Sequence, residues 1–228
     1  MLKCQNLFST ILLGGVLFFT ACDTQNKNEV KEKKVLLQGT ADETSYNTAQ
    51  KFFKFGEYDK ALEFHLKQLD EDLKYYEENS LEIALDYNNI GLDYDELKNY
   101  PKALEFYLKT MKIDELTLEK NSTERSTTYY NVAASYDELQ KYQEAIYFYL
   151  KALEIDEKVL SSDHENVWSE YEKLAFAYEQ ESNLTASLNY WQKSLTYMEH
   201  HFGKYALESN ETRAKIKEIE QSLLETRN

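Results

Sequence analysis

Apolar and aromatic residues return at fixed places every 42 residues along most of this chain. The recurring positions are Tyr58, Tyr100 and Tyr142; Ala61, Ala103 and Ala145; and Phe64, Phe106, Phe148 and Tyr190. Within each period the apolar residues follow the i, i+3, i+4 spacing of amphipathic helices. A period of this length is typical of stacked repeats, in which each unit buries its apolar face against its neighbours. We therefore predict an all-α array of helical hairpins.

Each period predicts two helices. The first helices centre on residues 48–49, 90–91, 132–133 and 174–175, and the second helices begin near Glu57, Asn99, Lys141 and Asn183. A small residue stands at the centre of each first helix, where a larger side chain would push two helix backbones apart. These small residues are Ala49, Gly91, Ala133 and Ala175. We expect them at the contacts between the two helices of each hairpin.

Polar residues in the loops predict where the first helices begin. Asn79, Asn121 and Asp163 are 42 residues apart, and each is a favoured N-cap. Glu82 and Glu124 follow three residues after the first two, in the manner of a capping box. At the other end, residues 205–228 predict a half-polar helix that shields the open end of the array.

The repeat pattern resembles the tetratricopeptide repeat. The residues that carry the resemblance are Tyr87, Ile90, Gly91, Tyr94, Ala103, Tyr107 and Thr110 in the second unit, and Tyr129, Val132, Ala133, Tyr136, Ala145, Tyr149 and Ala152 in the third. The usual repeat has about 34 residues, so the longer unit resembles the kinesin-light-chain-like subclass. The resemblance implies a right-handed α-solenoid with four units at about 43–79, 80–121, 122–163 and 164–204.

The beginning of the chain resembles a bacterial lipoprotein signal. Lys3 precedes an apolar run over residues 7–19, which is too short for a stable span of about 20 residues. The run ends in Phe19-Thr20-Ala21-Cys22, which is similar to a lipobox. The resemblance implies removal of residues 1–21 and attachment of acyl chains such as palmitate to Cys22. Ordinary cleaved secretion and an uncleaved anchor are the alternatives.

This interpretation places the protein in the cell envelope, anchored by lipid on the extracytoplasmic side of a membrane. Residues 22–42 are mostly polar and lack periodicity, so we expect a flexible tether between anchor and repeats. Cys4 would leave with the signal, and Cys22 is the only other cysteine. The mature chain would therefore have no disulfide and depend on packing alone.

The resemblance also implies which residues line the concave groove. One row is Asn47, Asn89, Asn131 and Lys173; a second includes Tyr46, Asn88 and Tyr130; a third includes Leu92 and Phe176; and an acidic row includes Asp95 and Asp137. In long-repeat members of the family, asparagines of the first row hydrogen-bond the backbone of an extended peptide. The alternatives for these asparagines are a local hydrogen bond between helices and plain solvation. The acidic row favours lysine or arginine on a partner, and its alternative is a solvated helix flank.

Charge and missing motifs narrow the function. The formal net charge of −15 argues against nonspecific binding to nucleic acid, which rewards a basic surface. The sequence has no glycine-rich phosphate loop, zinc-spaced cysteines or nucleophile elbow. We therefore expect no enzyme, cofactor, metal site or small-molecule substrate.

The leading interpretation is a membrane-anchored adaptor that binds an extended peptide of another protein. The alternative is a structural subunit or assembly factor of an envelope complex, contacting partners through its convex face or terminal helix.

Overall fold

The computed structural model describes residues 44–161 and 164–225, and within these ranges the chain forms nine α-helices and no strand. The helices are α1 (Thr44–Lys54), α2 (Tyr58–Asp72), α3 (Leu81–Glu96), α4 (Tyr100–Thr117), α5 (Thr123–Glu138), α6 (Tyr142–Val159), α7 (Glu165–Gln180), α8 (Leu184–His201) and α9 (Leu207–Glu225). The predicted signal, Cys22 and the predicted tether lie outside the described residues. The chain from α1 onward is an all-α solenoid, as predicted.

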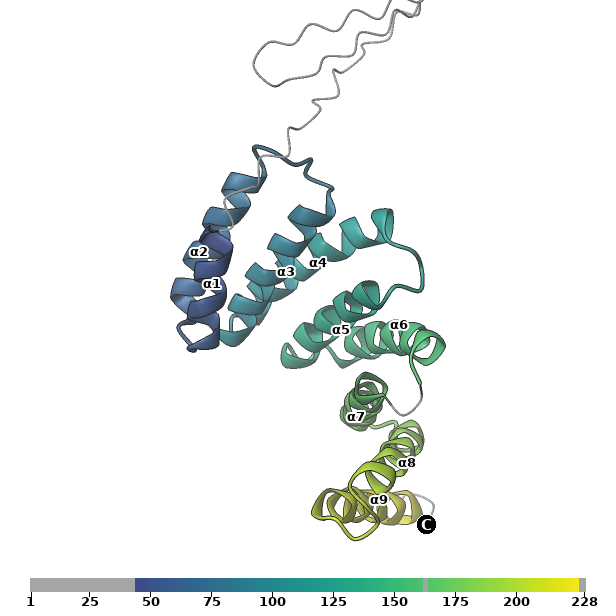
Figure 1. Ribbon diagram of the computed structural model, residues 1–228. Coiled ribbons are helices and arrows are strands. Elements are labelled where there is room, and N and C mark those ends of the chain that lie inside the picture. Colours follow the sequence, from purple (N-terminus) through teal and green to yellow (C-terminus); the bar gives the residue numbers. More distant parts are fainter. Residues whose placement is uncertain (1–43, 162–163, 226–228) are drawn as a thin grey trace, which may run out of the picture. The chain divides into compact units, whose positions relative to one another are not determined.

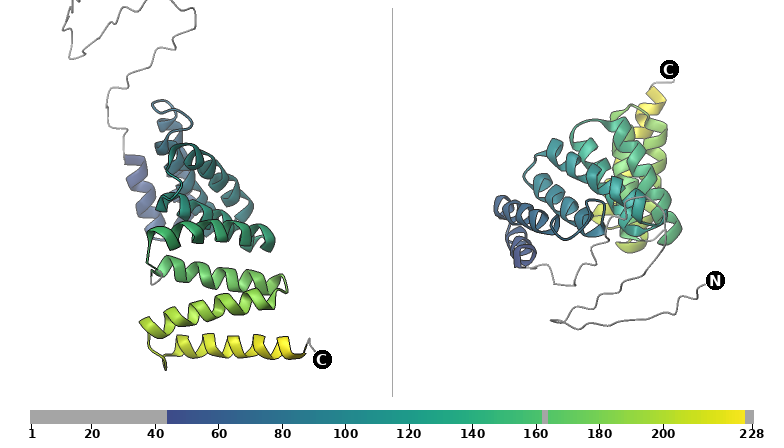
Figure 2. Two further views of the ribbon diagram at one scale, coloured as in Figure 1. Left: turned by 90° about the vertical axis from the view of Figure 1, so that its right-hand side faces the viewer. Right: turned by 90° about the horizontal axis from the view of Figure 1, so that it is seen from above.

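Each helix packs mainly on the helices before and after it in the chain. The helices pair as the hairpins α1–α2, α3–α4, α5–α6 and α7–α8, and α9 lies against α8 (Figures 1 and 2). Contacts between hairpins join α2 to α3, α4 to α5 and α6 to α7. Packing of this local kind is the defining property of a repeat array.

The turns within hairpins repeat the same backbone geometry. Gly56, Lys98, Gln140 and Ser182 all adopt positive φ, at 74°, 59°, 58° and 58°. After α3 the N–H of Asn99 donates to the carbonyl of Tyr94 at 2.8 Å, and the N–H of Lys98 donates to that of Asp95 at 2.8 Å. This pair of bonds is a Schellman motif, which satisfies carbonyls that the helix end leaves free.

The first helices begin one residue later than the loop pattern predicts. Ser80 Oγ accepts from the N–H of Ile83 at 3.3 Å, and Ser122 Oγ accepts from the N–H of Arg125 at 3.2 Å. The prediction of Asn79 and Asn121 as N-caps was wrong, because the neighbouring serines reach these amides instead. Asp163, the third predicted cap, lies outside the described residues.

Small residues and aromatic pairs hold each hairpin together. The eight small positions at the centres of the helices are all buried: Ala49, Gly91, Ala133 and Ala175 in first helices, and Ala61, Ala103, Ala145 and Ser187 in second helices. At Gly91 a Cβ atom would lie only 2.6 Å from Tyr107 Cε1, so the two helices approach most tightly there. Stacked rings join the helices of all four hairpins: Phe52–Phe64, Tyr94–Phe106, Tyr136–Phe148 and Tyr178–Tyr190.

Candidate protein-interaction surface

The four positions of the predicted asparagine row differ in environment. Asn47 is exposed, whereas Asn131 Nδ2 donates to Asn88 Oδ1 at 3.1 Å. The ammonium group of Lys173 lies 3.9 Å from Asp137 Oδ2. The row therefore does not present four equivalent side chains, and at Asn131 the hydrogen bond between helices is the one that forms.

Asn89 departs furthest from the expectation. Its side chain is only 6% exposed, and its Nδ2 has no hydrogen-bond partner among the described residues. It adjoins a small cavity between the first hairpin and α3, lined also by Gln50, Phe53, His65 and Leu92. The prediction that Asn89 faces an open groove was wrong. A step of one residue turns a helix by about 100°, so Asn88 takes the more accessible place.

The second predicted row connects successive first helices. Asn88 on α3 accepts from Asn131 on α5, and the hydroxyl of Tyr130 on α5 lies 3.0 Å from Ser169 Oγ on α7. The Tyr130 ring also packs edge-on against Tyr149, with ring centroids 5.4 Å apart. Asn88 and Tyr130 are both half-buried. In the first unit, Tyr46 is half-buried near His65.

The third row changes from buried to exposed along the array. Leu92 packs partly buried against the cluster of Ala103, Tyr107 and Val132. Phe176 on α7 is 43% exposed and contacts Tyr142 edge-on at 6.4 Å between centroids. An exposed aromatic side chain of this kind suits an anchor in a protein interface.

The acidic row is half-buried and partly paired. Burial raises the pKa of Asp95 and of Asp137 above the ordinary range, while the charge of Lys173 opposes the shift at both carboxyls. Glu179, the next acid of the row, accepts from Lys215 of α9 at 2.7 Å. These contacts neutralise part of the negative charge of the acidic row within the molecule itself.

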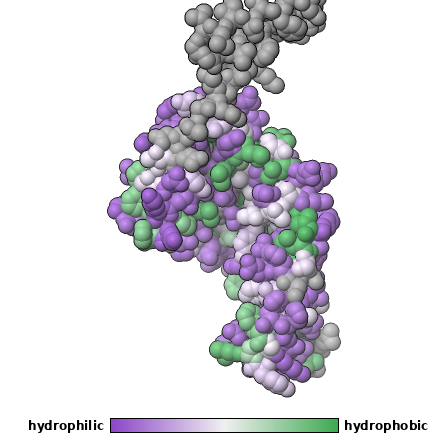
Figure 3. Space-filling view, in the orientation of Figure 1, coloured by the Kyte–Doolittle hydropathy of each residue, from purple (hydrophilic) through white to green (hydrophobic). Residues whose placement is uncertain are grey.

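A largely apolar cavity of about 400 Å³ lies between α3, α4 and α5. Its lining residues are Leu81, Ala84, Leu85, Asn88, Thr110, Asp114, Leu118, Glu124, Thr127 and Thr128. Leu81 and Leu85 at this cavity are 46% and 51% exposed. The face of the molecule in Figure 3 is largely hydrophilic and is interrupted by hydrophobic patches. Exposed leucines beside a cavity mark a candidate contact for a partner.

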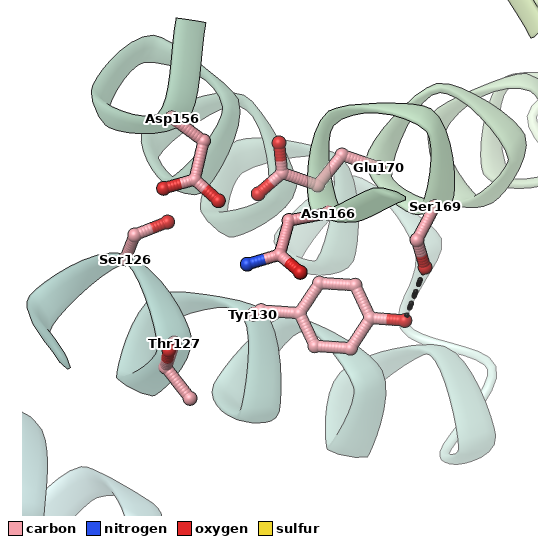
Figure 4. Close-up of a pocket in the computed structure, with 7 residues that line it drawn as sticks. All are labelled: Ser126, Thr127, Tyr130, Asp156, Asn166, Ser169 and Glu170. Carbon is pink, nitrogen blue, oxygen red and sulfur yellow. Dashed lines mark hydrogen bonds between the residues drawn. The ribbon is translucent and has the colours of Figure 1, made fainter. Parts of the chain in front are cut away.

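A second cavity, of about 280 Å³, occupies the same place one repeat later, between α5, α6 and α7 (Figure 4). It is lined by Ser126, Thr127, Tyr130, Asp156, Asn166, Ser169 and Glu170. Six of these correspond, 42 residues on, to Ala84, Leu85, Asn88, Asp114, Thr127 and Thr128 of the first cavity, and Asn166 corresponds to its Glu124. The repeat thus produces two equivalent cavities with different chemistry, the first apolar and the second polar.

A buried acid recurs where each hairpin meets the next, and its partner differs at the three junctions. Asp72 faces Asp86, Asp114 accepts from the Thr128 hydroxyl at 2.6 Å, and Asp156 faces Glu170. Burial, reinforced by Asp72, raises the pKa of Asp86 to about 8. Burial, reinforced by Asp156 and Glu157, raises the pKa of Glu170 to about 9. Both carboxyls therefore retain a proton to higher pH than an exposed carboxyl does.

The sequence profile of the tetratricopeptide repeat matches residues 43–116, 87–158 and 124–200 of this chain. The chain belongs to the tetratricopeptide repeat family. Proteins of this family bind protein or peptide partners and generally act as scaffolds rather than as enzymes. No curated protein sequence is significantly similar to this chain.

Several solved structures share this fold at low sequence identity. One such structure contains the nearly identical TPR-like repeats of a kinesin light chain from Podosopora anserina. Its sequence is 16% identical to this chain, with a TM-score of 0.64, and the match covers 78% of this chain and 90% of that one. BtubC (BKLC) from P. vanneervenii is 20% identical with a TM-score of 0.67, covering 78% of this chain and 71% of that one. The apo form of RapI is 20% identical with a TM-score of 0.61, and the match covers 76% of this chain and 45% of RapI.

The structure of this tetratricopeptide repeat protein also shows polar residues that motif reasoning missed. His65 is packed in the core, and its Nδ1 lies 2.6 Å from Asp93 Oδ2. Asp156 and Glu170 escaped notice because acids are frequent in this chain, although the 42-residue period locates both. Within residues 44–161 and 164–225, no three His, Cys, Asp or Glu side chains form a group suited to a metal ion. No helix in those ranges is both long and apolar enough to cross a bilayer.

Proposed function

We propose that this protein is a lipid-anchored adaptor of the bacterial cell envelope, whose repeats bind an extended segment of a partner protein. The observation that carries the binding surface is the pair of equivalent cavities beside Asn88 and Tyr130. An extended peptide places side chains at regular intervals. A row of cavities with the period of the repeat suits such a ligand better than it suits a compact surface.

The first cavity supplies an apolar contact in this groove. Leu81 and Leu85 expose about half of their surface there, although a leucine side chain gains about 1.5–3 kcal/mol from full burial. Asn88 at the same cavity offers an amide that both donates and accepts, as a peptide group does. An apolar side chain of the partner would cover the leucines, and the partner's backbone would hydrogen-bond the Asn88 amide.

Leu85→Asp is expected to reduce partner capture at least tenfold, because it places a charge where an apolar side chain of the partner would pack. Capture is measured by photo-crosslinking the full-length protein in intact cells and identifying the bound proteins. Leu116→Asp is the matched control, since Leu116 on the neighbouring α4 is 70% exposed and does not line the cavity. Both variants should keep the helical content of the wild type.

The opposite pattern would support the alternative function. If Leu116→Asp abolishes capture and Leu85→Asp leaves it unchanged, the partner contacts the exposed surface of α4 outside the cavity, and the groove is rejected. The double variant Asn88→Ala, Asn131→Ala is a second test of the groove, because it removes the hydrogen-bonded amides of α3 and α5.

The membrane anchor has its own test. In bacteria fed an alkyne analogue of palmitate, the protein is expected to carry the label and to sediment with membranes. Cys22→Ala should abolish both, because it removes the thiol that the lipobox resemblance designates. Cys4→Ala is the matched control and should change neither. Label retained in Cys22→Ala would reject the lipoprotein interpretation while leaving the adaptor proposal intact.

A further inference from the structure

The cavity between α5, α6 and α7 contains two buried carboxyl groups that point toward one another (Figure 4). Asp156 is 2% exposed and Glu170 is 1% exposed. Asp156 Oδ1 and Glu170 Oε2 have no hydrogen-bond partner among the described residues. A buried acceptor without a partner costs about 1–3 kcal/mol, so this cavity is matched to a ligand that donates hydrogen bonds.

The second junction supplies such a donor from the chain itself, and the first supplies one to Asp72 Oδ2 but leaves Asp72 Oδ1 and Asp86 Oδ2 without a partner among the described residues. Thr128 donates to Asp114 at 2.6 Å, and Gln68 Nε2 donates to Asp72 at 3.0 Å. No lysine, arginine or histidine is among the residues that line the cavity around Asp156. The third junction therefore combines two buried acids and unpaired acceptors with a cavity of about 280 Å³.

The shape and lining of this cavity select among cations. A guanidinium group is planar, carries five N–H donors and stays charged when it is buried. Its fork can serve two carboxyl groups at once. The Tyr130 ring forms part of the wall and offers an aromatic face to a cation. The volume of about 280 Å³ is several times the roughly 30 Å³ share of one water molecule.

We propose that this cavity binds the arginine side chain of a partner peptide, held between the carboxyl groups of Asp156 and Glu170. This inference rests on the proposed function, because it assigns the second cavity of the groove to one residue type. The first cavity would take an apolar side chain and the second an arginine, so the preferred segment combines the two.

The probe for this site is Nα-acetyl-L-argininamide, titrated into the full-length protein and followed by NMR chemical shifts of residues around the cavity. We expect saturable binding that the citrulline analogue does not reproduce, since citrulline has nearly the same shape without the charge. The probe needs no partner protein. Its failure would therefore overturn the arginine site alone, whereas failure of the Leu85→Asp test would overturn the groove.

Glu170→Thr is expected to weaken probe binding at least tenfold. The substitution copies the second junction, where Thr128 donates to Asp114, so the fold already accommodates this pair. Glu165→Gln is the matched control, because Glu165 is an exposed acid in the first turn of the same helix. Asp156→Asn provides a second variant of the site with the same expected loss.

The pH dependence gives an independent signature. Burial raises the pKa of Glu170 to about 9, with smaller contributions from Asp156 and Glu157 of α6. Tyr130 of α5 is the other titratable group at the cavity, and Lys193 of α8 lies 3.7 Å from Glu157. Glu170 must lose its proton to pair with a cation, and this loss becomes easier as the pH approaches its pKa, so affinity should rise between pH 6 and pH 9. This rise should vanish in Glu170→Thr.

Three results would overturn the proposal. They are equal binding of the citrulline analogue, equal loss of binding in Glu165→Gln and Glu170→Thr, and saturable binding of Ca²⁺ at this cavity without binding of the arginine probe. The last result would assign the two acids to a metal ion instead.

Discussion

Tyr149→Ala is expected to lower the free energy of unfolding by about 3–5 kcal/mol, the usual range for removal of a large buried aromatic side chain. Tyr149 is fully buried between α5, α6 and α7, where it packs with Ala133, Leu153 and Leu174. Its loss would leave a cavity in the middle of the array. Because contacts in a repeat array are local, the last two hairpins should then unfold as a separate cooperative step.

Chemical denaturation followed by circular dichroism measures this loss, and hydrogen exchange locates it. Tyr147→Ala is the control, since Tyr147 on the same helix is 55% exposed; its loss should stay below about 1 kcal/mol. Tyr149→Phe should be neutral or slightly stabilising, because the buried Tyr149 hydroxyl has no hydrogen-bond partner among the described residues. A similar loss in the two alanine variants would contradict the assignment of Tyr149 as a central core residue.

Asp86→Thr is expected to stabilise the protein increasingly as the pH rises. The pKa of Asp86 is about 8 in the folded state against an ordinary value of 3.8. Folding therefore takes up a proton between these pH values, and the contribution of this group to stability is lost as the pH rises through 8. The slope for one proton is at most about 1.4 kcal/mol per pH unit. Threonine removes it and can donate to Asp72, as Thr128 donates to Asp114.

The measurement is the free energy of unfolding of wild type and variant at several pH values between 5 and 9. The difference should be small at pH 5 and largest at pH 9. Glu82→Thr, which removes an exposed acid from the first turn of the same helix, controls for the general relief of negative charge. Equal pH profiles for Asp86→Thr and wild type would show that Asp86 ionises normally in the folded protein.

The sequence predicted the array because its period repeats both the core and the turns. Alanine or glycine at helix centres and aromatic residues opposite them leave little choice of register. The helix starts were wrong by one residue, because Asn79 and Ser80 are both good N-caps and only the backbone geometry decides between them. The wrong placement of Asn89 has a similar cause: neighbouring Asn88 and Asn89 are chemically identical, and a small rotation of α3 decides which one is buried.

The acid pairs were harder to predict than the helices. Asp156 and Glu170 stand among 41 acidic residues, most of which have no special environment. Their importance depends on burial and on the absence of a donor at one junction. Both features are visible only in the three-dimensional structure. The comparison of junctions at a 42-residue spacing is the signal that identifies them, since Thr128 satisfies Asp114 where Glu170 does not satisfy Asp156.

The packing of each helix mainly on its chain neighbours has an evolutionary consequence. Duplication or deletion of one 42-residue unit leaves every remaining interface of the same type, because no helix depends on a distant one. Gene rearrangement can therefore lengthen or shorten the interaction surface in whole steps. Each added step brings another cavity, whose lining can diverge from its copies as the apolar and acidic cavities of this chain have done.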